Sequence, residues 1–92
     1  MIALRLVIRG RVQGVGYRYS MVEVAAAKQV AGWVRNRRDG TVEAFVQGDA
    51  AAVDAVVAWC RRGPAPARVE SVESHPAASD PAVAEFTPLP TA

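Results

Sequence analysis

The sequence predicts an α+β fold with the element order βαββαβ, in which two helices cover one face of an antiparallel/mixed sheet. Three observations predict it. An alternating apolar segment, residues 2–9, leads through a glycine-rich loop into a helix-like segment. Two more alternating segments flank Asp39-Gly40, and a second helix-like segment stops at Gly63-Pro64. We expect these elements to form a single domain over residues 1–92, a length sufficient for one hydrophobic core.

The first strand and the first helix follow from two different periodicities. Residues 2–9 alternate between apolar positions and positions that carry Arg5 and Arg9, the period of a half-buried strand. The following segment repeats its core-facing positions at helical spacing. These positions are Tyr17, Met21, Val24 or Ala25, and Lys28. The repeat predicts a helix over residues 17–29, with the stem of Lys28 lying over apolar surface.

A hairpin and a second helix occupy the middle of the chain. Residues 32–38 and 41–47 read as two strands, and Asp39-Gly40 between them is a tight-turn dipeptide. Asp49 is the expected N-cap of the second helix. The buried stripe of that helix is Val53, Val56, Val57 and Cys60.

Cys60 is the only cysteine, so the chain can form no internal disulfide. Its place in the apolar stripe predicts an inert core thiol, and the absence of paired cysteines suits a reducing cytoplasm. Arg5 and Arg9 interrupt the N-terminal segment, which therefore does not read as a secretory signal. No run of about 18 apolar residues is present, so no membrane span is expected.

The C-terminal third predicts one full strand and one short one. Val69 and Val72 belong to a fourth strand, and residues 75–83 read as an exposed loop rich in Pro, Ala and Ser. Residues 85–87 form a short extra C-terminal strand. Pro88 and Pro90 lack the backbone donor that a longer strand needs.

This order of elements is that of the split-βαβ, ferredoxin-like sandwich. The hairpin then inserts the third strand between the first and the second, which run parallel to each other. Parallel strands end at the same edge of a sheet. The first strand ends at the glycine loop and the second ends near Asn36, so we expect Arg18 and Asn36 to meet at one rim.

The glycine loop, Gly10-Arg11-Val12-Gln13-Gly14-Val15-Gly16-Tyr17-Arg18, is typical of an anion site. A glycine-rich turn that opens onto a helix gathers free N–H groups and the positive end of the helix dipole. Arg18 adds a guanidinium that can hold two phosphate oxygens. The expected backbone donors are those of Val12, Gln13, Gly14, Val15 and Gly16.

Two generic glycine motifs are excluded. The nucleotide P-loop requires Lys-Ser or Lys-Thr after its second glycine, and the dinucleotide fingerprint requires a third glycine where Arg18 and Tyr19 stand. The lone His75 has no Cys or carboxylate cluster beside it in sequence, so neither a metal site nor a histidine nucleophile is expected.

The string GRVQGVGYR, however, resembles the signature of the acylphosphatases. Gly32-Trp33-Val34-Arg35-Asn36 followed by Asp39-Gly40-Thr41-Val42-Glu43 resembles the second signature of that family. The resemblance continues in order through four further sites and covers nearly the whole chain. These are Gly48, Trp59, Gly63-Pro64 and Ala67-Arg68-Val69.

The resemblance implies that the chain hydrolyses acyl phosphates to a carboxylate and inorganic phosphate. It implies that Arg18 binds the phosphate and that Asn36 orients the attacking water. It also implies direct in-line displacement with no phosphoenzyme, no metal and no cofactor. The family usually has leucine at position 28 and a helix-closing glycine at position 29, where this chain has Lys28 and Gln29. Both departures concern packing and the helix end.

The charge distribution allows a second interpretation. Residues 1–40 carry eight basic and two acidic residues, a formal charge of +6, and residues 41–92 carry three basic and seven acidic residues, a charge of −4. A basic half attracts small anionic substrates and also nucleic acid. The alternative is therefore a non-catalytic ferredoxin-like module that binds RNA or an anionic ligand.

RNA modules of this fold need aromatic side chains on the central strands, and here only Phe45 is predicted there. Trp33 and Trp59 read as packing residues. Nucleic acid is for this reason not an expected partner. The expected partners are an acyl phosphate and inorganic phosphate, bound by a monomer in the cytoplasm.

Overall fold

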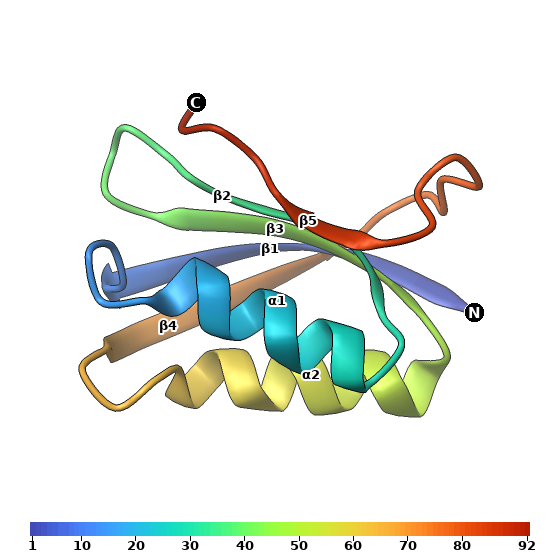
Figure 1. Cartoon of the computed structure of the whole chain (residues 1–92), viewed down its shortest axis with the longest axis horizontal. Helices are drawn as coiled ribbons and strands as arrows, with labels where there is room; N and C mark the ends of the chain where they lie inside the picture. The colour runs from blue at the N-terminus through green and yellow to red at the C-terminus, as the bar shows by residue number, and fades with distance from the viewer.

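The computed structural model describes residues 1–92 as a five-stranded sheet with both helices on one face (Figure 1). The elements follow the predicted order with one short strand added at the end. They are β1 (Ile2–Arg11), α1 (Tyr17–Ala27), β2 (Ala31–Asn36), β3 (Val42–Gly48), α2 (Ala50–Arg62), β4 (Arg68–Pro76) and β5 (Phe86–Pro88). Neither helix is long and apolar enough to cross a membrane.

The strand order is β4-β1-β3-β2-β5, which confirms the predicted ferredoxin-like arrangement. β3 lies between β1 and β2 and pairs antiparallel with both, in the registers Ile8↔Val42 and Asn36↔Val42 at one end. β1 and β2 therefore run parallel, and both end near the same edge of the sheet. The edge strand β5 pairs parallel with β2, with Phe86 opposite Gly32.

The hydrophobic core lies between the sheet and the two helices. It is formed by 16 buried residues, among them Leu6, Ile8, Met21, Val34, Val46, Val53 and Val56. Tyr17 joins the helices across this core: its hydroxyl donates to the carbonyl of Cys60 at 2.8 Å, and its ring packs on Trp59 with centroids 5.2 Å apart. Burial raises the pKa of Tyr17, with a smaller contribution from Cys60.

The prediction that Cys60 is an inert core thiol is confirmed. The residue is fully buried, and this desolvation raises the pKa of its thiol to about 11. Only the thiolate is a good nucleophile, so Cys60 stays unreactive at neutral pH.

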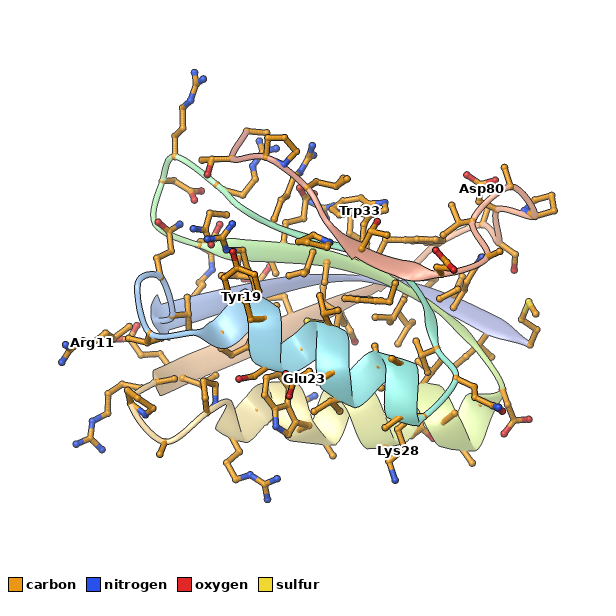
Figure 2. All side chains as sticks on the ribbon, viewed as in Figure 1. Arg11, Tyr19, Glu23, Lys28, Trp33 and Asp80 are labelled. Atoms are coloured by element: carbon orange, nitrogen blue, oxygen red, sulfur yellow. The ribbon has the colours of Figure 1, made fainter.

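Three sequence predictions are wrong in detail. His75 lies in β4 rather than in a loop, because β1 is ten residues long and pairs with β4 as far as Leu4↔Pro76. Residues 37–38 belong to the turn after β2, since strand pairing stops at Asn36. Lys28 lies just beyond α1 with its side chain exposed rather than on the buried stripe (Figure 2). The prediction that Asp49 is the N-cap of α2 is confirmed, although its side chain makes no capping hydrogen bond.

The short C-terminal strand is confirmed, and the chain continues to follow β2 beyond it. Pro88 and Pro90 cannot donate, yet Leu89 donates its backbone N–H to the carbonyl of Val34 at 2.8 Å. Ala92 in turn donates to the carbonyl of Asn36 at 3.0 Å. The residues between the prolines and after them thus cover the outer edge of β2.

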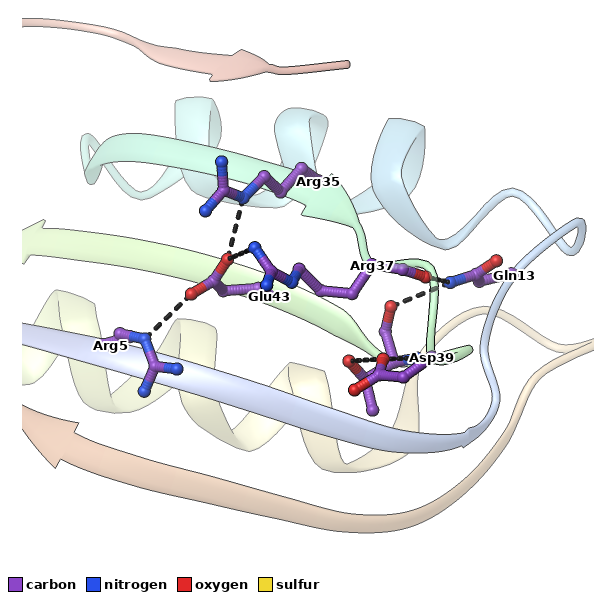
Figure 3. A network of polar contacts seen from close by, with 7 residues as sticks. Arg5, Gln13, Arg35, Arg37, Asp39 and Glu43 are labelled. Carbon is purple, nitrogen blue, oxygen red and sulfur yellow. Dashed lines mark hydrogen bonds and ion pairs between the residues drawn. The ribbon is translucent and has the colours of Figure 1, made fainter. Parts of the chain in front are cut away.

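The face of the sheet opposite the helices carries a charge network centred on Glu43 (Figure 3). This residue is 6% exposed. Its carboxylate accepts from Nε of Arg5 and of Arg35 at 2.8 Å each, and Nη1 of Arg37 lies 3.5 Å from it. Desolvation alone would raise the pKa of Glu43, but the hydrogen bonds from Arg35 and Arg5 outweigh it and lower that pKa. Arg35 is therefore held against the sheet, whereas Arg37 makes a longer contact and is more exposed.

The end of α1 places a non-glycine residue in the left-handed region. Gln29 has φ 58°, the only positive φ outside glycine. The N–H of Val30 donates to the carbonyl of Ala25 at 2.9 Å, and that of Gln29 donates to Ala26 at 3.1 Å. These two bonds form a Schellman motif, whose C′ position glycine occupies with least strain.

We expect Gln29→Gly to stabilise the protein by about 1 kcal/mol, because the left-handed backbone costs an L-residue roughly that much. For a chain of this size, the expected rise of the thermal midpoint is about 4 °C. The matched control is Lys28→Gly, whose φ of −93° gives glycine no advantage, so that this variant should lose stability. Thermal unfolding followed by circular dichroism measures both. Equal losses in the two variants would show that position 29 is not strained.

Candidate functional site

The loop between β1 and α1, residues 12–16, carries a run of backbone N–H donors and is here called the cradle. Gly14 has φ 73° and Gly16 has φ 80°, whereas Gln13 and Val15 do not have positive φ. Alternation of this kind turns successive N–H groups toward one concavity that suits an anion. A Cβ on either glycine would meet no atom within 4 Å. The glycines are therefore required by backbone conformation and not by lack of space.

The N–H groups of the cradle have no hydrogen-bond acceptor in the protein. The first backbone bond after the cradle runs from the N–H of Ser20 to the carbonyl of Gly16 at 3.1 Å. α1 begins without a side-chain cap and without an acidic residue in its first turn. The free donors and the positive end of the helix dipole are thus uncompensated at this point, as the sequence predicts for an anion site.

Arg18 is the second residue of α1 and is half-buried. No carboxylate forms an ion pair with its guanidinium; the acidic partners of the structure, Glu43 and Glu73, pair with other residues. The neighbouring Tyr19 is exposed at the start of α1 (Figure 2). Arg18 consequently adds a full, uncompensated positive charge at the end of the helix that follows the cradle.

Asn36 is the last residue of β2 and has an unusual side chain. Its Oδ1 is buried and accepts no hydrogen bond from the protein. An unpaired buried acceptor costs about 1–3 kcal/mol, which favours a site whose missing donor comes from a bound molecule. A water molecule or a substrate group can supply that donor.

The cradle and the end of β2 are joined by one side chain. Nε2 of Gln13 donates to the carbonyl of Arg37 at 2.8 Å and to the carbonyl of Thr41 at 2.9 Å (Figure 3). Arg37 directly follows Asn36, so the cradle lies beside the strand end that carries the unpaired amide. The two hydrogen bonds thus bring the glycine-rich loop and the end of β2 together at one end of the sheet, as the sequence predicted. Arg18 and Asn36 make no hydrogen bond with each other.

This role of the Gln13 side chain was not predicted from the sequence. The loop motif indicated only its backbone N–H as a phosphate ligand. The two hydrogen bonds join residues that are 24 and 28 positions apart in the sequence, and a local sequence pattern does not predict contacts between residues so far apart. A glutamine inside a glycine-rich loop is the only signal that was present.

Further hydrogen bonds stabilise the β2–β3 turn that accepts from Gln13. Oδ1 of Asp39 accepts from the hydroxyl of Thr41 at 2.7 Å and from its backbone N–H at 3.0 Å. These two bonds, the hydroxyl first, lower the pKa of Asp39. The backbone bond from Arg37 to the carbonyl of Thr41, 2.8 Å long, closes the turn. Gly40 supplies the left-handed residue with φ 93°.

No three His, Cys, Asp or Glu side chains are grouped so that they could hold a metal ion. His75 lies on the open face of the sheet, where its Nε2 is 3.6 Å from the carboxylate of Glu73. It is therefore remote from the cradle and takes no part in the candidate site.

The family model described as Acylphosphatase matches residues 4–88 of the chain. Among similar proteins is an acylphosphatase of Nitrobacter hamburgensis, 58% identical over 76 residues, which are 83% of this chain and 77% of that protein. Another is an acylphosphatase of Bradyrhizobium diazoefficiens, 50% identical over 93 residues, with 96% of this chain and 94% of that protein covered.

The fold leads to the same family. The crystal structure of the acylphosphatase from Bacillus subtilis superimposes with a TM-score of 0.92 at 32% identity, covering 97% of this chain and 99% of the other. The match of the family model to nearly the whole chain, the identity to these relatives and the shared fold lead to one conclusion. The chain belongs to the acylphosphatase family, whose members are enzymes that hydrolyse acyl phosphates.

Proposed function

We propose that the chain hydrolyses the carboxyl–phosphate bond of acyl phosphates by in-line attack of a water molecule. Asn36 orients this water, and Arg18 together with the N–H groups of the cradle holds the phosphate. The observation that carries the proposal is the buried, unpaired Oδ1 of Asn36 at the strand end to which the cradle is tied.

The cradle supports the phosphate part of this mechanism. Its N–H groups are free, fixed in direction by Gly14 and Gly16, and adjacent to the positive end of α1. The guanidinium of Arg18 has no acidic partner and can donate two parallel hydrogen bonds to phosphate oxygens. Fixed donors and a fixed cation stabilise the charge that spreads over the phosphoryl oxygens in a loose transition state.

The amide of Asn36 supports the water part. Oδ1 can accept one hydrogen of a water molecule, which leaves an oxygen lone pair free to face phosphorus. As the new P–O bond forms, the bond between phosphorus and the acyl oxygen breaks and the carboxylate leaves with the electron pair. The water protons pass to the product phosphate and to solvent. A carboxylate is a good leaving group, so positioning contributes more than general-base catalysis.

The alternative of an RNA-binding sheet receives little support. Phe45 is 8% exposed, and Trp33 stacks against it with ring centroids 6.3 Å apart. The guanidinium of Arg35 covers Trp33 at 4.9 Å from the ring centroid. The aromatic faces that would stack on bases are therefore already occupied by the protein.

The direct test is hydrolysis of benzoyl phosphate by the purified, metal-free protein, followed by loss of ultraviolet absorbance. We expect turnover that EDTA does not reduce, and competitive inhibition by inorganic phosphate, because the phosphate ligands are backbone donors and one arginine. Activity that disappears in EDTA and returns with magnesium would contradict the proposal.

The role of Asn36 predicts a selective defect in Asn36→Ala. Removal of the amide takes away the partner of the water and leaves the phosphate donors in place. We expect kcat to fall about a hundredfold or more, while the inhibition constant for phosphate changes little. Near-normal turnover by a folded Asn36→Ala variant would assign the orientation of water to another group.

Arg18 is tested by a substitution that preserves its charge. A lysine ammonium is a point donor and cannot replace two parallel N–H bonds in one plane. We expect Arg18→Lys to lower kcat/KM about 30- to 1000-fold, equivalent to roughly 2–4 kcal/mol of transition-state stabilisation.

The matched control for Arg18 is Arg38→Lys, at an exposed arginine whose side chain makes no ion pair or hydrogen bond. It should change kcat/KM by less than about twofold, since steering depends on charge and is screened by salt. Measurements at low and high ionic strength compare the two. If both variants respond alike, Arg18 is a steering charge and not a phosphate ligand.

A further inference from the structure

The two halves of the proposed site are carried by strands that do not touch. β1 pairs with β3 only as far as Ile8↔Val42. Beyond that point it pairs with β4 alone, and the register shifts between Arg9 and Gly10. The cradle therefore leaves the sheet from the β1–β4 side, whereas Asn36 stands at the end of β2, two strands away.

The Gln13 amide makes the only hydrogen bonds between the cradle and the β2–β3 turn. Both of its N–H groups are used, one on the carbonyl of Arg37 and one on that of Thr41. The cradle backbone makes no bond to the turn. In Figure 3 the Gln13 side chain reaches across from the loop to the two carbonyls at the end of the hairpin.

The β2–β3 turn, whose carbonyls accept from Gln13, is itself held by hydrogen bonds. The Arg37–Thr41 backbone bond closes the turn, and Asn36 pairs with Val42 in the last rung of the β2–β3 ladder. The carbonyl of Arg37 is one residue from Asn36. A fixed distance from Gln13 to this carbonyl is thus nearly a fixed distance from the cradle to the Asn36 amide.

We propose that the side chain of Gln13 is a positioning residue that sets the separation and angle between the bound phosphate and the water on Asn36. The inference rests on the function proposed above. In-line attack requires the water oxygen, phosphorus and leaving oxygen to be nearly collinear, and a displacement of about 1 Å at such a site costs on the order of a hundredfold in rate. Gln13 acts through Asn36 and the cradle and does not itself exchange protons or bonds with the substrate.

The first variant is Gln13→Met, which keeps the length of the side chain and removes both donors. We expect kcat on benzoyl phosphate to fall about 10- to 100-fold, because the water is no longer held in line. The inhibition constant for inorganic phosphate should stay within about threefold, since the cradle N–H groups and Arg18 remain. An equal loss in kcat and in phosphate affinity would show that Gln13 shapes the cradle alone.

The chain contains a matched control at the opposite end of β3. Nε2 of Gln47 also donates to two backbone carbonyls, those of Asp80 at 2.8 Å and of Val83 at 2.9 Å. Its Oε1 also accepts from the N–H of Asp80 at 2.8 Å, and the side chain thus fastens a surface loop to the sheet far from Asn36. Gln47→Met should lower the thermal midpoint at least as much as Gln13→Met, because it loses three hydrogen bonds rather than two, and should leave kcat within about twofold of the wild type.

The decisive measurement is a double-mutant cycle with Asn36→Ala. If Gln13 acts by placing the water on Asn36, Gln13→Met should lower kcat by less than about threefold once the amide is gone. Multiplicative losses would mean that the two side chains act independently, and the inference would be wrong. Gln13→Asn, which keeps the amide on a shorter stem, replaces Gln13→Met in the cycle if the latter does not fold.

Different results would refute the proposed hydrolase function and the proposed role of Gln13. Wild-type protein that does not hydrolyse benzoyl phosphate refutes the proposed function. Active wild type together with a Gln13→Met variant as active as Gln47→Met refutes only the role of Gln13.

Discussion

β3 is inserted between β1 and β2 and runs antiparallel to both, and the rest of the molecule depends on this pairing. Because of it, two strands that are distant in sequence run parallel and end at one edge of the sheet. One of them ends in a glycine-rich loop and the other ends in an asparagine. Both crossover helices then pack on the same face, so that α1 starts where the loop ends (Figure 1).

Unsatisfied polar groups are concentrated at that edge. The cradle N–H groups, the guanidinium of Arg18 and Oδ1 of Asn36 all lack partners within the protein. Other buried polar side chains are paired: the Tyr17 hydroxyl bonds across the core, and Glu43 accepts from Arg5 and Arg35 on the open face. A buried group without a partner lowers stability, so its persistence at one place is consistent with a ligand that completes it.

The two faces of the sheet carry charge in different ways. On the open face, Glu43 holds Arg5 and Arg35 in short ion pairs and Glu73 pairs with Arg9, so part of the positive charge there is neutralised. At the rim above the helices, Arg18 has no counterion, and the helix dipole adds to its charge. The basic residues of the first forty positions therefore include an unpaired arginine beside the cradle and several arginines paired with carboxylates on the other face.

The sequence by itself determined the element order, the glycine-rich loop before the first helix and a second strand that ends near Asn36, although that strand stops two residues earlier than predicted. Periodicity and glycine stereochemistry are local properties, and they do not need the rest of the chain. The tertiary structure alone decided that Gln13 bonds to Arg37 and Thr41, that His75 joins β4 and that Lys28 stays exposed. Each of these features depends on which segments, distant in sequence, lie next to the residue in the folded protein. That is settled by strand pairing and core packing, and not by the propensity of the residue itself.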